Sequence, residues 1–409
     1  MNNTNAAPHL KWYMLSLAAL THTLVVAMPT MCMPVLFKEI SEDLGLSLVQ
    51  VGAVWGIGSL TGIFTGLVGG SLGDRYGVRR TLTVICLLAG MAGALRGFAT
   101  DFVTLSATIL VFGLLTPAIP MNVHKVCGVW FDRQQLGLAN GVVSAGMALG
   151  FVAASMISAT VLSPMLGGWR HVLFLYGVIS AGMSIPWALS RNAPGERGAS
   201  TGDASAVSIP QALAHVIRIR NVWFLGFALM GVSGCVQGVL GYLSLYLQNI
   251  GWPAASADGA LGAFHTVSLI SAIPITLLSD RLSSRRTIIV TAVSMIIVGA
   301  ALLSVASGPA VWAAVIIAGA FRDGFMAIFM TTVIESEGVG AAYAGTAIGL
   351  VMVFSGLGAL ISPPLGNSLS QISLSAPFVF WAAIAAVAAW TFRFVKWPSH
   401  EPLPQMGHT

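Results

Sequence analysis

Long apolar segments alternate along the chain with short polar connections. Each apolar segment is long enough for an α-helix to cross the roughly 30 Å of hydrocarbon in a bilayer. Within these segments hydrophobic and polar residues do not alternate, which excludes the strands of a membrane β-barrel. The pattern predicts twelve membrane helices, at residues 11–37, 48–72, 80–99, 103–126, 137–162, 171–190, 221–249, 258–279, 286–306, 309–333, 342–366 and 376–396.

One polar connection, residues 191–220, is longer than the others and divides the chain into six helices plus six. Its first part is rich in Gly, Ser, Ala and Pro, as flexible linkers are, and from Pro210 onward it predicts a short amphipathic helix. The sequence therefore predicts an N-terminal six-helix half at 1–190, a linker, and a C-terminal six-helix half at 221–409.

Two charged segments, Gly73–Arg80 and Ser279–Arg286, lie at corresponding positions in the two halves, between the second and third apolar segments of each. An internal repeat of this length indicates a duplicated bundle of membrane helices. In such a bundle one half can rock against the other, which moves a solute without an open pore.

The composition excludes a soluble protein. Of 409 residues, 56% are hydrophobic and 8% are charged, whereas soluble domains carry about a quarter charged residues. The four cysteines are scattered without a CxxC spacing, so neither a metal site nor a disulfide is expected. We find no nucleotide-binding loop, metal cluster or nucleophile–base pair, and we expect neither enzyme activity nor a cofactor.

The basic residues are distributed unequally between the two sides of the predicted membrane. With the N-terminus in the cytoplasm, 15 of the 19 Lys and Arg residues fall on the cytoplasmic side and three on the far side. By the positive-inside rule this predicts a multi-pass protein of the inner (plasma) membrane with both termini in the cytoplasm. Because the charges lie in short connections, they do not indicate binding to nucleic acid.

The segment Gly70–Leu82 reads GSLGDRYGVRRTL. With the twelve segments and the six-plus-six division, it resembles the major facilitator superfamily, whose signature in this loop is G-x-L-A-D-R-x-G-R-K-x-x-L. The departures are Gly73 for Ala, Val78 for Arg and Arg79 for Lys. The resemblance covers nearly the whole chain and implies an all-α integral membrane fold of two pseudo-symmetric halves, rocker-switch alternating access, and a monomer.

The resemblance also implies a gating role for this loop. Asp74 would accept hydrogen bonds from Arg75, Arg79 or neighbouring helix ends, and so latch the cytoplasmic side while the site faces outward. Gly73 and Gly77 belong to the same motif. The second copy keeps Asp280 and Arg281 but lacks the glycine that corresponds to Gly77. Topology anchoring is the alternative role for these arginines.

Arg322 and Asp323 lie near the middle of the tenth predicted helix. Ionisable residues at membrane depth are costly and are candidate site residues by default. In the family that this chain resembles, helices 1, 4, 7 and 10 line the central cavity. An arginine there suits an anion, above all a carboxylate. Consecutive helical residues point about 100° apart. Either Arg322 therefore faces substrate while Asp323 faces a neighbouring helix, or both belong to a structural charge network.

Further polar residues are candidates for the same cavity. His22, on the first helix, is expected either to bind substrate, to carry a coupling proton or to pack between helices. Arg96 and Lys125 are expected to extend their charges to the membrane surface. The remaining candidate substrate contacts are Gln237, Thr116, Asn122 and His124.

Acidic residues are scarce in the predicted spans. Asp323 is the one carboxylate expected at mid-membrane depth, because Glu335 and Glu337 lie at the cytoplasmic end. Proton coupling would therefore use Asp323, His22 or the carboxyl group of the substrate, with uniport and anion exchange as alternatives.

These observations predict a secondary transporter for a small organic anion, preferably a carboxylate. The alternative is an exporter of neutral or cationic hydrophobic compounds, in which Asp323 rather than Arg322 faces the cavity. A receptor or scaffold that uses the fold without transport has little support.

Overall fold

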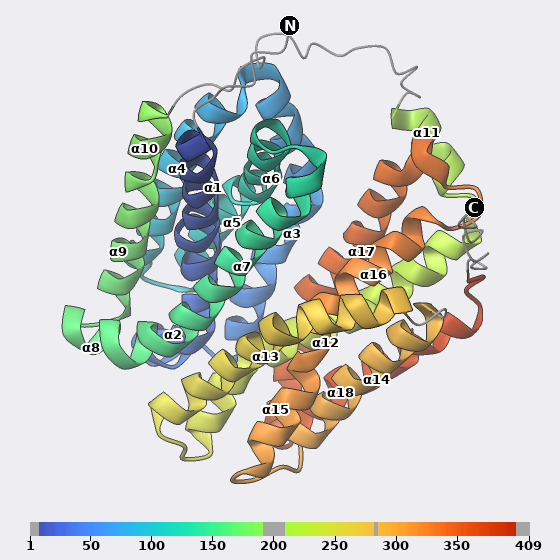
Figure 1. The fold of residues 1–409 in the computed structure, drawn as a ribbon. Helices are drawn as coiled ribbons and strands as arrows, with labels where there is room; N and C mark the ends of the chain where they lie inside the picture. Colours follow the sequence, from blue (N-terminus) through green and yellow to red (C-terminus); the bar gives the residue numbers. More distant parts are fainter. Residues whose placement is uncertain (1–7, 191–208, 282–284, 398–409) are drawn as a thin grey trace, which may run out of the picture.

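The computed structural model describes residues 8–190, 209–281 and 285–397, and every regular element in these ranges is a helix (Figure 1). The N-terminal group, defined as residues 8–190, contains α1 (Pro8–Thr21), the π-helical turn η1 (His22–Ala27), α2 (Met28–Leu44), α3 (Leu48–Tyr76), α4 (Val78–Leu95), the 3₁₀ turn η2 (Arg96–Phe98), α5 (Phe102–Leu115), α6 (Ala118–Trp130), α7 (Arg133–Ile157), the π-helical turn η3 (Ser158–Leu162), α8 (Ser163–Leu166), α9 (Trp169–Gly182) and α10 (Ser184–Leu189).

The C-terminal group, defined as the described residues from 209 onward, continues the chain. It contains α11 (Ile209–Val216), α12 (Arg220–Asn249), α13 (Ala254–Arg281), α14 (Arg285–Leu303), α15 (Ala310–Ala320), α16 (Arg322–Ile334), α17 (Gly340–Ser368), the 3₁₀ turn η4 (Leu369–Gln371), α18 (Ala376–Trp390) and the 3₁₀ turn η5 (Thr391–Arg393). Helix α11 is the short helix predicted from Pro210, and residues 191–208 of the predicted linker lie outside the described residues.

Ten stretches of described residues are long and apolar enough to cross a membrane. The other two predicted segments, 48–72 and 258–279, fall on the long helices α3 and α13. The side chains of α3 are described only in part, and that helix contributes a shorter apolar stretch, Leu48–Thr61. The structure is therefore a multi-pass membrane fold with ten candidate membrane helices, and the number twelve stays a prediction.

The two groups pack together toward one end of the molecule. We name the two ends after the limits of α3: the Leu48 end and the Gly77 end. Figure 1 shows the groups converging toward the Leu48 end and diverging toward the Gly77 end. At the Leu48 end α3 lies against α17, and the side-chain amide of Asn367 donates a hydrogen bond to the Leu48 carbonyl at 2.8 Å.

The contact between α3 and α17 depends on glycine. A Cβ on Gly56 would lie 2.4 Å from the Leu360 carbonyl oxygen, and one on Gly52 would lie 2.8 Å from the Pro363 backbone. The two backbones therefore touch, as small residues permit in membrane helices. No larger side chain fits at either position without separating the groups.

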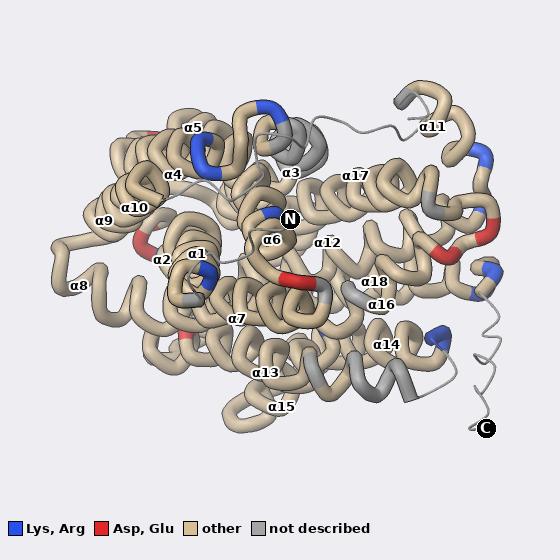
Figure 2. The backbone as a smooth tube through the Cα atoms, turned by 45° about the horizontal axis from the view of Figure 1, so that its top comes forward, with Lys and Arg blue, Asp and Glu red and all other residues tan. Residues whose placement is uncertain are grey.

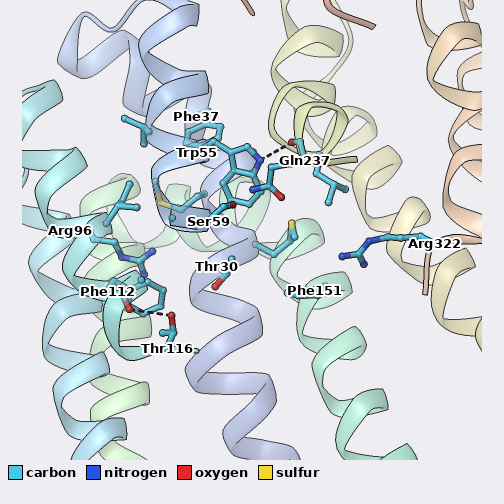
Figure 3. Close-up of a pocket in the computed structure, with 17 residues that line it drawn as sticks. Thr30, Phe37, Trp55, Ser59, Arg96, Phe112, Thr116, Phe151, Gln237 and Arg322 are labelled. Atoms are coloured by element: carbon cyan, nitrogen blue, oxygen red, sulfur yellow. Dashed lines mark hydrogen bonds between the residues drawn. The ribbon is translucent and has the colours of Figure 1, made fainter. Parts of the chain in front are cut away.

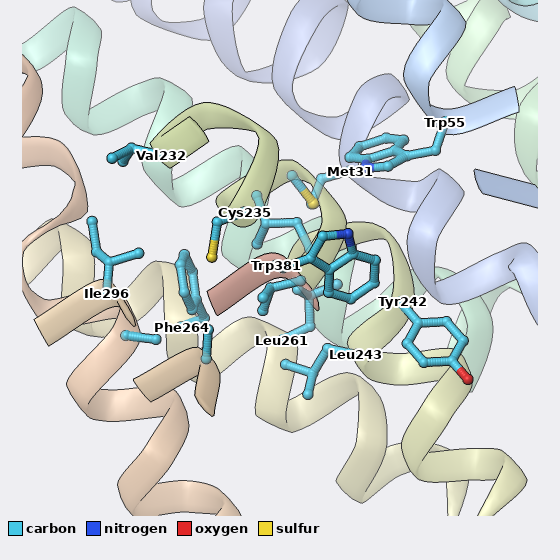
Figure 4. Packing of buried hydrophobic residues seen from close by; sticks show 14 of the residues in the cluster. Met31, Trp55, Val232, Cys235, Tyr242, Leu243, Leu261, Phe264, Ile296 and Trp381 are labelled. Carbon is cyan, nitrogen blue, oxygen red and sulfur yellow. The ribbon is translucent and has the colours of Figure 1, made fainter. Parts of the chain in front are cut away.

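A single hydrophobic core crosses from one group to the other around α12. Trp381 of α18 packs against α12 and donates its indole N–H to the Ser362 carbonyl at 3.0 Å. Figure 4 shows Met31 and Trp55 of the N-terminal group beside Trp381 and Tyr242 of the C-terminal group. The core thus supports the convergence at the Leu48 end.

Charged residues lie mainly near helix ends and connections. Most of the tube in Figure 2 is free of Lys, Arg, Asp and Glu. This distribution fits helices whose middle portions face lipid or each other, because a charge in hydrocarbon costs several kcal/mol, on the order of 2.5–3.5 in insertion experiments.

Several of the predicted membrane segments are not regular α-helices throughout; among them, the fifth contains η3 and the sixth breaks at Met183. The first contains the π-helical turn η1, the fourth breaks between α5 and α6 at Thr116–Pro117, and the tenth breaks between α15 and α16 at Phe321. Pro117 lacks a backbone N–H, which explains the break between α5 and α6. Such irregular backbone at membrane depth is tolerated where it is buried in protein or lines a cavity.

Within the N-terminal group, α4 and α9 are in backbone contact. A Cβ on Gly177 would lie 2.4 Å from the Ala94 nitrogen, and a Cβ on Gly90 would lie 2.2 Å from the Ala181 nitrogen. Gly182 is the last residue of α9, and a Cβ added to it would have no other atom within 4 Å. These two glycines of α9 therefore offer a matched test of helix contact.

We predict that Gly177→Ala lowers stability whereas Gly182→Ala does not. The added methyl at position 177 must push α4 and α9 apart, at a cost of about 1–3 kcal/mol for overpacking. At position 182 it meets open space and only improves helix propensity. Thermal unfolding in detergent measures the difference; equal unfolding temperatures for the two variants would contradict the contact.

Candidate functional site

A cavity of about 240 Å³ lies between the two groups. Its wall is mostly apolar, and its charged members are two arginines, Arg96 and Arg322. The remaining residues of the wall are Thr30, Met31, Met33, Phe37, Val54, Trp55, Gly58, Ser59, Ile109, Phe112, Gly113, Thr116, Phe151, Gln237 and Leu240 (Figure 3). An apolar cavity with a few polar groups is the usual form of a small-molecule site.

Arg322 reaches the cavity from the C-terminal group. It is the first residue of α16, directly after the break at Phe321. Its Nη1 donates to the Asp323 carboxylate at 3.1 Å, with side-chain exposures of 24% and 37%. Both side chains are partly exposed, so a ligand in the cavity can compete for the guanidinium. Asp323 also lies in the first turn of α16, where the helix dipole favours its negative charge.

Arg96 reaches the same cavity from the N-terminal group, contrary to the prediction that it extends to the membrane surface. The residue is 1% exposed. Its Nε donates to the Gly93 carbonyl at 3.2 Å, its Nη1 donates to the Pro29 carbonyl at 2.8 Å, and its guanidinium carbon lies 4.1 Å from the centre of the Phe112 ring. These contacts hold the charge inside the protein.

Neutral polar groups line the cavity between the two arginines. Thr116 and Gln237, both predicted substrate contacts, belong to the wall. The Thr116 hydroxyl donates to the Phe112 carbonyl at 3.1 Å, which leaves its oxygen available as an acceptor. The Trp55 indole N–H donates to the Gln237 carbonyl at 2.8 Å, so the wall itself joins the two groups.

The other predicted substrate contacts are not in the cavity wall. His22, in η1, is buried with Nδ1 3.3 Å from the Val143 carbonyl oxygen, and its ring centre lies 5.9 Å from that of His124. His124 in turn bonds to the Asn140 side chain at 2.9 Å. These histidines form a separate polar cluster between α6, α7 and η1.

Asn122 faces away from the cavity because it packs on the motif loop. Its amide donates to the Ala118 carbonyl at 2.8 Å, and a Cβ on Gly73 would lie 1.8 Å from its Oδ1. Position 73 must therefore be glycine, because α6 lies so close to α3 that the Asn122 side chain leaves no room for a Cβ there. In this structure Asn122 supports the motif rather than the cavity.

The remaining motif residues organise the turn between α3 and α4. Gly77 has φ +82°, a conformation that side chains disfavour, and its N–H bonds to the Gly73 carbonyl at 3.0 Å. The Arg79 guanidinium donates to the Ala188 carbonyl, and Arg75 lies over the Tyr76 ring at 5.4 Å. The side chains of Asp74, Asp280 and Arg281 lie outside the described residues.

One buried acid was missed by the sequence analysis, which expected Asp323 as the one carboxylate at membrane depth. Asp258 of α13 is fully buried and accepts a hydrogen bond from the Ser244 hydroxyl at 2.5 Å. It is the first residue of the predicted span 258–279, and the sequence analysis did not single it out. The signal in the sequence was an acidic residue at the start of an apolar segment.

Several proteins resemble this chain in sequence. It is 27% identical over 222 residues to the "Probable L-galactonate transporter" of Escherichia coli (strain K12), covering 51% of this chain and 48% of that protein. It is 26% identical over 163 residues to the "Probable galactarate/D-glucarate transporter GudP" of the same strain, covering 37% and 34%. It is 24% identical over 149 residues to the "Probable sulfoacetate transporter SauU" of Cupriavidus necator, covering 36% and 34%. The chain thus spans a third to a half of the length of these relatives.

Solved structures share the fold over nearly the full chain. The crystal structure of a bacterial homolog of the human lysosomal transporter Spinster, inward-facing and unoccupied, aligns with a TM-score of 0.75 and 16% identity, covering 97% of this chain and 100% of that one. The nucleoside transporter NupG aligns with a TM-score of 0.74 and 16% identity, covering 94% and 98%.

The match to the Major Facilitator Superfamily extends over residues 16–346, which is most of the chain. Together with the helical architecture and the motif at Gly70–Leu82, it establishes that this chain belongs to the Major Facilitator Superfamily, a family of membrane transporters rather than enzymes.

Proposed function

We propose that the protein is a secondary transporter of a small organic anion, preferably a carboxylate. The observation that carries the proposal is Arg322, which projects into a cavity between the two groups from a break in a membrane helix. A guanidinium binds carboxylates through paired hydrogen bonds, and in a largely apolar cavity the interaction is stronger than in water. The named substrates of the relatives reported above are all acids, which supports the same class.

The size and charge of the cavity argue against export of bulky hydrophobic compounds. A volume of about 240 Å³ is below the range of about 300–1,000 Å³ typical of sites for drug-sized ligands. That alternative also required Asp323 to face the cavity, whereas Arg322 belongs to the wall and Asp323 does not. Both features favour a small anion.

We further propose that residues 1–190 and 221–409 act as two six-helix halves of a twelve-helix monomer in the inner membrane. The Gly77 end would face the cytoplasm, as the distribution of Lys and Arg suggests. The convergence at the Leu48 end then corresponds to a state that is closed to the outside. Transport requires the contact between α3 and α17 to open, by rocking of one half against the other.

Coupling to protons is proposed through Asp323. The carboxylate has Arg322 as its partner, and a bound anion would compete for the same guanidinium. The anion would displace the carboxylate from its partner. Anion binding and proton uptake would thereby occur together. His22, with its neighbour His124, is the second candidate for the coupling proton.

Arg322→Ala is expected to abolish binding of carboxylates, and Arg322→Lys to weaken it. A hydrogen bond to a charged group contributes about 1.5–3 kcal/mol, so affinity falls by at least about tenfold. Thermal-shift titration and uptake into proteoliposomes measure both variants. Arg393→Ala, which removes an exposed arginine at η5, is the matched control. Unchanged binding and uptake in both Arg322 variants would refute the anion site.

Asp323→Asn is expected to remove the dependence of uptake on a proton gradient while preserving exchange of anion for anion. In exchange, the binding site crosses in both directions with an anion bound, so no proton is needed. In net uptake, the anion enters together with the proton that the Asp323 carboxylate carries. Uptake at a series of pH values, driven by a pH gradient or by internal anion, separates the two modes. If proton-driven uptake survives in Asp323→Asn, Asp323 does not carry the coupling proton, and His22 becomes the candidate.

Gly56→Leu is expected to favour the state that is open at the Leu48 end. The leucine side chain cannot fit beside the Leu360 carbonyl, which lies 2.4 Å from the position of a Cβ. A cysteine introduced at Met33, a cavity residue that is 3% exposed, reports the change through labelling by a membrane-impermeant maleimide from outside. Gly349→Leu, where a Cβ has nothing within 4 Å, is the control. Equal labelling in both variants would contradict the proposed movement.

A further inference from the structure

Arg96 is a fully buried charge that the proposed carboxylate site does not use. Its side chain is among the largest that are less than 2% exposed. A charge taken out of water is costly unless it is paired. The carbonyls of Gly93 and Pro29 and the face of Phe112 compensate part of this cost, but none of them is negatively charged.

Three acidic side chains close to Arg96 in the chain or at the same end of the molecule have other partners. Asp101 caps α5 by accepting the Thr104 N–H at 2.9 Å. Glu39 accepts the Ser163 hydroxyl at 2.5 Å, and Asp43 is paired with Arg170. Within the described ranges, Arg96 therefore has no acidic partner.

The Arg96 guanidinium also retains an unused donor. Nε and Nη1 make the two hydrogen bonds to carbonyls, whereas Nη2 is buried and has no hydrogen-bond partner among the described residues. An unsatisfied buried donor costs about 1–3 kcal/mol, and more when it is charged. Arg96 belongs to the cavity wall, so a rotation of its side chain would bring this buried donor to a ligand in the cavity.

Figure 3 shows Arg96 and Arg322 on opposite sides of the cavity, with Thr30, Thr116 and Phe151 between them. Arg96 comes from η2 of the N-terminal group and Arg322 from α16 of the C-terminal group. The charge of Arg322 is balanced by Asp323, whereas that of Arg96 is not. A monoanion on Arg322 would leave Arg96 unpaired.

We propose that the transported substrate is a dianion, with one anionic group bound by Arg322 and the second by the guanidinium of Arg96. The inference rests on the proposed anion-transport function and narrows its substrate class. A dianion of suitable length bridges the two groups of helices across the cavity. Neutral hydrogen-bonding groups between its ends would meet the hydroxyls of Thr116 and Thr30.

A purely structural arginine is the competing explanation, and selectivity distinguishes the two. A structural Arg96 would change stability without changing the preference of the site between ligands. If Arg96 binds substrate, it raises the affinity for a diacid above the affinity for the monoacid with the same number of carbons. The ratio can be measured on the wild-type protein alone, so it does not depend on a variant that folds.

The experiment is a thermal-shift titration of the full-length protein in detergent with malonate, succinate and glutarate, each paired with propionate, butyrate or pentanoate at equal ionic strength. For the best-fitting diacid, the half-saturating concentration should be at least about tenfold lower than for its monoacid, the difference expected from one charge-assisted hydrogen bond of about 1.4 kcal/mol. Arg96→Gln should bring this ratio close to one, because it weakens diacid binding more than monoacid binding. Arg322→Gln should abolish binding of both acids.

Different failures have different meanings. If monoacids and diacids bind wild type equally while Arg322→Gln abolishes both, the dianion inference is wrong and the anion transporter stands. The inference also fails if Arg96→Gln, or Arg96→Lys where the glutamine variant does not fold, keeps the full preference for diacids. If no acid stabilises the wild type, the proposed function fails together with the inference. Arg393→Gln serves as control and should keep the wild-type ratio.

Discussion

The absence of water in the hydrocarbon layer is the constraint on which this structure depends. Every backbone polar group there must find a partner within the protein, so the described membrane segments are helices, and each charge inside must be held by protein groups or by a ligand. Interruptions of the helices are therefore informative. The breaks at Thr116–Pro117 and at Phe321 both adjoin residues of the central cavity. At these two breaks irregular backbone and cavity occur together, because a cavity makes the irregularity tolerable.

Glycine has a complementary role in the packing of the helices. Between α4 and α9, glycines bring backbones into contact within the N-terminal group, which makes that group one firmly packed body. Between α3 and α17, glycines make the contact that joins the two groups. The same residue type thus serves an interface within one group and an interface between the two groups. The difference lies in the surroundings: the second interface also carries polar bonds, such as that from Asn367 to Leu48.

The sequence predicted the fold class and part of the site. Hydrophobic segments and the motif at Gly70–Leu82 were sufficient for the family, and the positions of Thr116, Gln237 and Arg322 in their segments agree with the cavity wall. The prediction failed for Arg96 because its depth depends on η2 and on a carbonyl, that of Pro29, which lies 67 positions away in the chain. For Asn122 the face of the helix depends on the break before α6, which shifts the angular position of every later residue.

Trp55 joins the cavity to the contact between the two groups. Its indole forms part of the cavity wall, packs against Gly241 and bonds to the Gln237 backbone in the opposite group. Opening the Leu48 end must therefore break this bond and remove part of the wall in a single movement. In the proposed cycle, the closed cavity and a path at the Leu48 end would then be mutually exclusive, which would suppress leakage of solute past the site. The fidelity of the transport cycle would thus depend on one shared side chain, without a separate gate.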